Sequence, residues 1–418
     1  MTTTTPSRGS GRATFLFLQA TAFLNAAGVG LVIPVLPFLA ERHVGDPAKL
    51  ASAVGWLAAS YSLGAFLAAP ALGALSDRVG RRPVLLLSLA GSAAGYLLSG
   101  LAGALSILFL GRLIDGLTAG NMGALFAYVG DTAPAEERTA RFGKLGAVSG
   151  AGLIVGPALG GLAVKLGGVR APFFFAAALV TFNVLWGLVF LPESLSPENR
   201  AHGVSWAKLN PFSQLLGLFE FKYLSRLLLA GVFCTAALVC LPTTFPLLAK
   251  DRLGWGADRV SFVVILVGAT DILVQGFLLA HLERLFGGAR LLLIGLGLTF
   301  FGFVSMALVA IYPSVPLFLA AIVGFAGGEG MFTSSFNARL SEAAGPSAQG
   351  RVQGGNHALS ELTTAIVPIL VTQLYARSGP GAPYWASAAV TAGACLLLPR
   401  VARPPAAVAT AQEERIRP

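Results

Sequence analysis

The chain has 418 residues, of which 55% are hydrophobic and only 11% are charged, and its formal net charge is +10. A soluble protein has about a quarter of its residues charged. The composition therefore excludes an ordinary soluble domain and indicates a protein embedded in a lipid bilayer.

Apolar runs of about 20 residues, enough to cross ~30 Å of hydrocarbon as a helix, recur along the whole chain. The strands of an outer-membrane barrel would be about half as long and alternate in polarity. We therefore predict an all-α membrane protein with twelve transmembrane helices in two pseudo-symmetric six-helix bundles. The expected spans are 14–40, 52–75, 84–104, 106–129, 143–166, 171–191, 224–249, 259–281, 290–312, 315–337, 352–377 and 381–400.

The longest polar stretch divides these spans six and six. It predicts an N-terminal bundle (1–191), a cytoplasmic linker (192–222) and a C-terminal bundle with a short cytoplasmic tail (223–418). The two halves resemble each other, and Glu283 falls opposite Asp77 when they are aligned. Internal repeats around a central site are typical of secondary transporters.

Most Lys and Arg residues fall in or next to the segments that are cytoplasmic if the N-terminus is cytoplasmic, and only Arg112 lies inside a span away from its ends. This bias favours both termini in the cytoplasm and a multi-pass protein of the inner (cytoplasmic) membrane. The positive charge thus reflects topology, so the lipid bilayer is an expected partner and nucleic acid is not. Cys234, Cys240 and Cys395 show neither ligand spacing nor a pairing pattern, and we expect no metal.

The loop after the second span is GALSDRVGRRPVLL. Gly73 would allow a close helix contact and Gly80 a tight turn, while Asp77 could lie at a neighbouring helix N-terminus, where negative charge is favoured. Topogenic charges around a turn are the alternative interpretation. The candidate gating residues of this loop are Gly73, Asp77, Arg78, Gly80, Arg81 and Arg82.

The fifth span contains GLIVGPALGG. Gly152, Gly156 and Gly160 form a stripe of small residues that lets helix backbones approach closely, and Pro157 removes a backbone donor and can bend the helix. A packing role and a gating role both remain open for this stripe.

These motifs carry a resemblance to a known family. The loop resembles the signature loop of the major facilitator superfamily, LFLGRLIDG is similar around Arg112 to its arginine motif, and GLIVGPALGG is similar to a motif found chiefly in its exporters. LNAAGVGLVIPVLP and QGRVQGGNHALSELTTAIVP are similar to the tetracycline-efflux branch of the drug:proton antiporters. The resemblance covers most of the chain and implies export of a small molecule in exchange for protons.

The chain departs from that branch at several acidic positions. The branch carries an aspartate where this chain has Asn25, and others near the positions of Gly95 and Thr299. In the family these carboxylates are tied to metal–tetracycline and proton handling, which argues against tetracycline itself as substrate. The family can carry a histidine where this chain has Asp271. At Gln275 this chain has the same residue as the family.

Four carboxylates lie well inside the expected spans: Asp115, Asp271, Glu329 and Glu361. Intramembrane ionisable groups usually face a cavity or a partner. Arg112 and Asp115 stand at i, i+3 and can pair, so a purely structural ion pair is one interpretation. Three of the acids lie in the second half, where we expect proton and cation chemistry to concentrate.

Polar residues at helical spacing extend these acids into stripes that need a wet cavity. We expect Asp271, Glu329 and Glu361 to include the proton carrier and the counter-charge of the substrate, because a buried acid can load and release a proton. His357 is open to interpretation as a surface histidine or a proton relay. The candidate coupling and binding residues are Asp271, Glu329, Glu361, Asp115, Arg112, Asn25, Gln275, His357 and Asn337.

We therefore expect a monomeric proton-coupled exporter of an amphipathic, cationic or metal-chelated molecule, working by alternating access. Its partners would be a small-molecule substrate and protons. Uptake by symport, a lipid or glycolipid flippase and a non-transporting membrane sensor remain alternatives. We find no metal-ligand spacing, no nucleophile–base arrangement and no nucleotide loop, so we expect neither an enzyme nor a cofactor.

Overall fold

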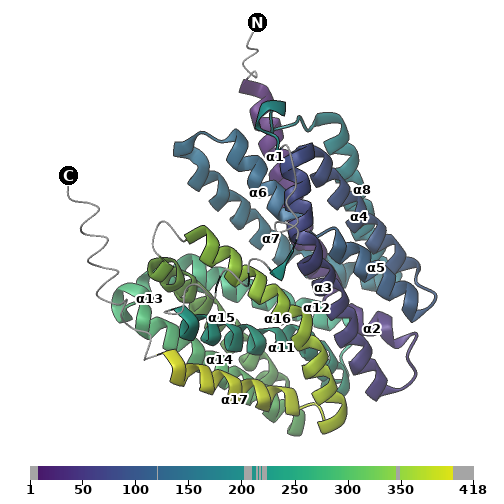
Figure 1. Cartoon of the computed structure of the whole chain (residues 1–418). Helices are drawn as coiled ribbons and strands as arrows, with labels where there is room; N and C mark the ends of the chain where they lie inside the picture. The colour runs from purple at the N-terminus through teal and green to yellow at the C-terminus, as the bar shows by residue number, and fades with distance from the viewer. Residues whose placement is uncertain are drawn as a thin grey trace, which may run out of the picture.

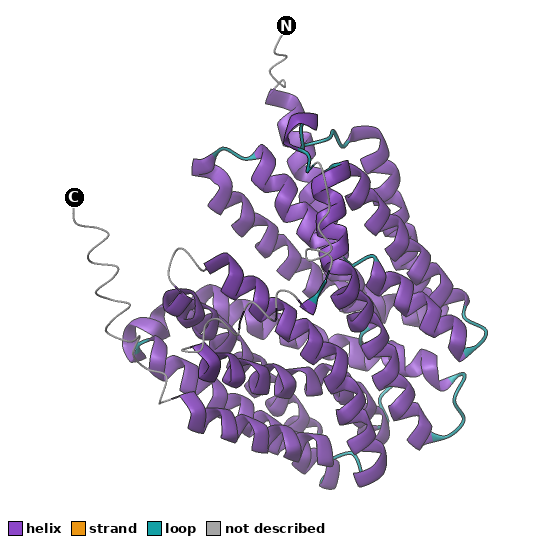
Figure 2. Cartoon of the chain, in the orientation of Figure 1, coloured by secondary structure: helices purple, strands orange, loops and turns teal. Residues whose placement is uncertain are grey.

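The computed structural model describes residues 8–119, 121–201, 224–344 and 349–398, and residues 210–212, 215 and 218 of the segment that connects the two halves. All regular elements in this described part of the chain are helices (Figure 2). The prediction of an all-α membrane protein is confirmed.

The first half is built from α1 (Arg8–Val32), α2 (Leu36–Glu41), α3 (Pro47–Val79), α4 (Arg81–Leu101), α5 (Leu105–Leu117), α6 (Asn121–Thr132), α7 (Ala135–Gly167) and α8 (Ala171–Phe190). A short 3-10 helix, η1 (Pro197–Asn199), follows. The second half is built from α11 (Ser225–Leu253), α12 (Ala257–Asp271), the π-helix η3 (Ile272–Leu278), α13 (Leu279–Phe286), α14 (Gly288–Ile311), α15 (Val315–Ala344), α16 (Gln349–Ser378) and α17 (Ala382–Leu397).

Each of the twelve predicted spans coincides with a helix or a run of consecutive helices. Ten described helices are long and apolar enough to cross a membrane, and α17 is a shorter apolar helix. The expected span 106–129 is divided between α5 and α6. The first span breaks at Pro34, because proline lacks a backbone N–H and disfavours helical geometry in the residue before it.

The helices form two bundles that Figure 1 shows in purple to teal and in teal to yellow. In the first bundle α1 packs on α7, and α4 packs on α5 and α8. In the second, α14 packs on α15 and α17, and α11 packs on α16 and α17. The main contacts between the bundles are made by α3 with α16 and by α7 with α12.

The two bundles meet on the side opposite the start of α1 and the end of α17, which we call the far side; they diverge toward the other side, the terminus side (Figure 1). On the far side, Lys250 Nζ lies 2.7 Å from Glu41 Oε1, and Gln373 Nε2 donates a hydrogen bond of 3.0 Å to Ser52 Oγ. Gly55 of α3 lies directly against α16, because a Cβ there would come within 2.6 Å of the Pro368 carbonyl oxygen. The structure is thus closed on the far side.

Two described residues of the segment between the bundles each contact one bundle. The ring of Phe212 lies 5.5 Å from the ring of Phe66 on α3, and the side chain of Leu218 packs against Gly355 of α16. Most of the expected linker, 192–222, lies outside the described residues from position 202 onward.

Gly55→Ala is expected to open the far side, because the added Cβ collides with the backbone of α16. Spin labels at two exposed far-side positions, Lys49→Cys on α3 and Arg259→Cys on α12, report the separation of the bundles in a background without native cysteines. The distance distribution should shift toward longer values in Gly55→Ala. Gly73→Ala is the matched control on α3, because nothing lies within 4 Å of a Cβ at that position. Equal distributions for both variants would contradict the far-side contact.

Candidate functional site

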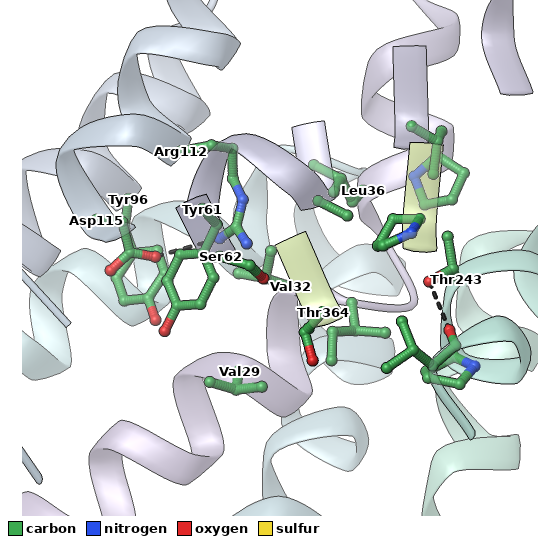
Figure 3. Close-up of a pocket in the computed structure, with 17 residues that line it drawn as sticks. Val29, Val32, Leu36, Tyr61, Ser62, Tyr96, Arg112, Asp115, Thr243 and Thr364 are labelled. Carbon is green, nitrogen blue, oxygen red and sulfur yellow. Dashed lines mark hydrogen bonds and ion pairs between the residues drawn. The ribbon is translucent and has the colours of Figure 1, made fainter. Parts of the chain in front are cut away.

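A cavity of about 240 Å³ lies between the two bundles (Figure 3). We call it the central cavity. Its walls come from α1, α2, α3, α4 and α5 of the first bundle and from α11 and α16 of the second. Most of the lining is apolar, and the polar lining residues are Tyr61, Ser62, Tyr96, Arg112, Asp115, Thr243 and Thr364.

A buried ion pair lies in the first-bundle wall of the central cavity. Arg112 Nη1 lies 3.2 Å from Asp115 Oδ2, and the carboxylate is almost fully enclosed (residue exposure 4%). The guanidinium of Arg112 also lies over the ring of Tyr61, 4.4 Å from its centroid, and the side chain of Ser92 lies near Asp115. The ion pair predicted from the i, i+3 spacing is therefore present, next to a space that can hold a ligand (Figure 3).

Gly95 on α4 makes room for this ion pair. A Cβ at Gly95 would lie 2.7 Å from the carbonyl oxygen of Gly111 and 2.8 Å from the Cβ of Asp115, so α4 and α5 touch at this point. From the sequence alone, Gly95 is only a position near which the related antiporters carry a carboxylate. Gly95 of α4 leaves the space that Asp115 of α5 occupies. This contact joins two different helices, so it is visible only in the packed structure.

A second acidic group lies where α12 and η3 meet α15. Gln275 Nε2 donates a hydrogen bond of 3.3 Å to Asp271 Oδ1, and Ser334 Oγ donates one of 3.4 Å to Gln275 Oε1. Gly330 allows the close approach, because a Cβ there would lie 3.2 Å from Asp271 Oδ1. Glu329, the residue before it, is near enough to interact electrostatically with Asp271. The structure thus brings Asp271, Gln275 and Glu329 together.

The helix changes character immediately after Asp271. Residues Ile272–Leu278 form a π-helix that contains Gln275 and continues into α13. π-helical turns are rare and occur frequently at functional sites. This wider helical turn lies beside the acidic group. The periodicity of an apolar sequence does not reveal such a π-helix.

Glu361 lies on α16, between two pockets. It interacts electrostatically with Tyr61 of the central cavity and with His357 one turn earlier. Thr364, three residues later, lines the central cavity. Asn337 and His357 instead line a second pocket, of about 300 Å³, nearer the terminus side. Asn25 is half-buried on α1 and belongs to the lining of neither pocket.

The signature loop is held by a network of charged side chains. Gly80 has φ +117°, so the predicted tight turn is confirmed. Arg81 Nη1 lies 2.5 Å from Asp77 Oδ1, and its Nε lies 3.0 Å from Asp131 Oδ2. Glu193 accepts hydrogen bonds of 2.8 and 3.2 Å from the backbone N–H groups of Arg81 and Arg82. Glu193 therefore occupies the N-terminus of α4, where a negative charge is favoured. Asp77 does not take this place, because its carboxylate pairs with the side chain of Arg81.

The other loop residues have different environments. Arg82 Nη2 donates a hydrogen bond of 2.7 Å to the Leu188 carbonyl oxygen of α8, and Arg78 is exposed. The expectation that Gly73 permits a close helix contact is wrong in this conformation, because nothing lies within 4 Å of a Cβ at that position. The reason is that Gly73 lies in the last two turns of α3, and the bundles diverge toward the terminus side, where α3 ends (Figure 1).

The small-residue stripe of the fifth span packs within the first bundle. A Cβ at Gly152 or Gly156 would collide with the backbone of α1, and Pro157 of α7 fits against Gly30 of α1, 2.7 Å from a Cβ placed there. A Cβ at Gly160 would lie 3.2 Å from the side chain of Leu31. The packing role of the stripe is therefore present, and its gating role stays a prediction.

Comparison with known proteins agrees with this architecture. The family model described as Major Facilitator Superfamily matches residues 19–360 and 227–418. The class C tetracycline resistance protein of Escherichia coli is 33% identical over 389 residues, which cover 92% of this chain and 94% of that protein. The class G protein of Vibrio anguillarum is 35% identical over 85% of this chain and 88% of that protein. Multidrug resistance protein 2 of Bacillus subtilis is 28% identical over 85% of this chain and 87% of that protein.

Solved structures share the fold. The human organic anion transporter MFSD10 superimposes with a TM-score of 0.68 at 24% identity, over 93% of this chain and 99% of that one. The nucleoside transporter NupG superimposes with a TM-score of 0.75 at 13% identity, over 93% of this chain and 98% of that one.

Gly95→Ala is expected to lower the free energy of unfolding by about 1–3 kcal/mol, because the added methyl group overpacks the α4–α5 contact and pushes against Asp115. Thermal unfolding can be followed with a thiol-reactive dye, since Cys234 and Cys240 are buried in the folded protein. Gly123→Ala on α6 is the control, because nothing lies within 4 Å of its Cβ position. If the two variants unfold at the same temperature, Gly95 does not seat Asp115.

Proposed function

The chain belongs to the Major Facilitator Superfamily, and from that premise we propose that it is a proton-coupled antiporter that exports an amphipathic small molecule by alternating access. It is a membrane transporter of small molecules and not an enzyme. Beyond this transporter role, we propose the direction of transport, the coupling to protons and the class of substrate.

The observation that carries the proposal is the position of the central cavity. It lies between two bundles that touch on the far side and diverge on the terminus side (Figure 1), and a buried ion pair forms part of its wall. Rocking of residues 1–191 against residues 223–418, joined by 192–222, would expose this cavity to each side of the membrane in turn. An ion pair with a purely structural role would not need to face an open space.

The lining suggests an amphipathic substrate with a cationic group. Valine, leucine, isoleucine, alanine and proline side chains form most of the wall, while Tyr61, Ser62 and Thr243 offer a few hydroxyl groups that can orient a ligand. Asp115 neutralises the charge of Arg112 within the wall. Glu361, near Tyr61, then supplies a negative charge for a cationic substrate.

Two arrangements support a coupling to protons. Protonation of Asp115 would remove the partner of Arg112 and so change the charge presented to the central cavity. Asp271 and Glu329 interact electrostatically, so a proton that binds to one of them changes the field at the other. Both arrangements convert the arrival of a proton into a change in electrostatics at membrane depth.

The relatives support export of a drug-like molecule. Those named for tetracycline resistance and multidrug resistance are 28–35% identical over most of the chain. The changes at Asn25, Gly95 and Thr299 favour a substrate other than tetracycline. We further propose a monomer in the cytoplasmic membrane with both termini in the cytoplasm, in which case the structure is the state open to the cytoplasm.

Everted membrane vesicles, which take up an exported substrate into their lumen, test the direction and the coupling. With an acidic lumen, ethidium is expected to accumulate inside, and its addition should make the lumen more alkaline, because each molecule enters in exchange for protons. A pH-sensitive dye reports the second flux, and vesicles without the protein provide the background. Movement of ethidium and protons in the same direction would instead identify a symporter.

Four neutral substitutions test which carboxylates couple transport to protons: Asp115→Asn, Asp271→Asn, Glu329→Gln and Glu361→Gln. At least one is expected to abolish gradient-driven accumulation while substrate exchange without a gradient persists, because the substrate site remains but the proton site is lost. Glu198→Gln on η1, at an exposed position outside both pockets, is the matched control. Full coupling in all four variants would rule out this assignment.

A further inference from the structure

The second pocket, which we call the polar pocket, has a lining whose described residues all belong to the second bundle. It has a volume of about 300 Å³ and lies between α11, α15 and α16. Seven polar side chains from these three helices converge on it: Thr235, Thr333, Asn337, Gln353, Asn356, His357 and Ser360. The central cavity shares none of these residues.

The lining of the polar pocket is uncharged apart from the titratable His357. Among the described residues, it contains no carboxylate, lysine or arginine. Amide and hydroxyl groups can each donate and accept hydrogen bonds, and the side chains of Asn337, Gln353 and Asn356 form none with other described residues. At membrane depth such groups must face water or a ligand. The pocket therefore presents unused donors and acceptors but almost no charge.

An aromatic surface forms another part of the lining. Phe332 and Phe336 stack on each other with ring centroids 5.4 Å apart and an angle of 23° between the planes. Gly231 lets Phe336 lie directly against α11, because a Cβ there would come within 2.5 Å of its ring. Both rings are largely buried in a hydrophobic core cluster, so this surface is rigidly held.

The polar pocket and the central cavity follow each other along the same two helices. On α16, Ser360 lines the polar pocket and Thr364 lines the central cavity, a separation of about 6 Å along the helix axis. On α11, Leu238 and Val239 are neighbours that line one pocket each. Glu361 lies at the junction. A molecule that moves from the terminus side toward the central cavity would reach the polar pocket first.

We propose that the polar pocket is a second substrate-binding site, which takes an uncharged, hydroxyl-rich ring such as a glycosyl group on the exported molecule. A neutral ring with many hydroxyl groups matches a lining in which nearly every polar group both donates and accepts, beside a fixed aromatic surface. In the described lining a cationic group would find no opposite formal charge, and an anionic group would find one only on protonated His357. The proposal rests on the proposed export function, since it assigns the order in which one substrate meets two sites.

A matched pair of probes tests the chemistry: radiolabelled phenyl β-D-glucoside and its tetra-O-methyl derivative, which keeps the ring but lacks hydroxyl donors. Binding is measured with the full-length protein in lipid nanodiscs. The glucoside is expected to bind about tenfold more tightly than the methylated ring, which corresponds to one or two lost hydrogen bonds. Equal binding of both probes, or no binding of the glucoside, would overturn the proposal.

Substitutions then locate the site. Asn337→Leu and Gln353→Met keep the side-chain size but remove the amide, and each is expected to weaken glucoside binding about fivefold to tenfold. Asn199→Leu, at an exposed position on η1, should bind as the unchanged protein does. Thermal unfolding followed at the buried cysteines verifies that each variant is folded. Unchanged glucoside binding in both folded pocket variants would place the site elsewhere and overturn the assignment.

These binding measurements need neither a proton gradient nor net transport. Glucoside binding at the polar pocket in a protein that fails the vesicle test would contradict antiport and leave the site standing. Antiport of ethidium by a protein that binds neither probe would contradict the polar pocket and leave the proposed function standing.

Discussion

The cost of an ionisable side chain in hydrocarbon is the constraint on which the rest of this structure depends. Even on translocon-based scales it is about 2.5–3.5 kcal/mol for one group at the centre of a helix, so each such group needs a partner or water. Asp115 pairs with Arg112, and Asp271 accepts a hydrogen bond from Gln275. These polar groups lie where helices converge around the central cavity or within the second bundle. The positions of the charges therefore indicate which faces of the helices turn away from lipid.

Close backbone packing makes this arrangement possible without adding further polar groups. Gly152 and Gly156 let α7 lie directly on α1, and Gly95 lets α4 lie on α5 beside Asp115. These contacts are inside one bundle, whereas the contact of Gly55 with α16 joins two bundles. Lipid provides no hydrophobic force between helices, so small residues that bring backbones into van der Waals contact hold each bundle together. Each bundle can then act as one body while fewer contacts hold the far side closed.

Much of the fold could be predicted from the sequence, because span length and charge bias are local properties. The pairing of Arg112 with Asp115 was also predictable, since both residues lie on one helix at i, i+3. The capping of α4 by Glu193 was not, because residues more than a hundred positions apart make the contact. The π-helix after Asp271 was missed for another reason: an apolar sequence has no side-chain periodicity that separates it from an α-helix. The close packing of the Gly152 and Gly156 stripe was predictable from its spacing, whereas the helix that it contacts was visible only in the structure.

Gly95 and Asp115 show how packing changes the meaning of a substitution. From the sequence, the branch's aspartate near Gly95 is simply absent, which suggests that the acidic chemistry lies in the second half. In the structure, the backbone of α4 at Gly95 touches α5 at Asp115, so a carboxylate is present at this place but comes from the neighbouring helix. A side chain on α4 would occupy the space that Asp115 fills. Glycine at one position and aspartate at the other are thus two parts of one arrangement, and the first bundle keeps an acid beside the central cavity.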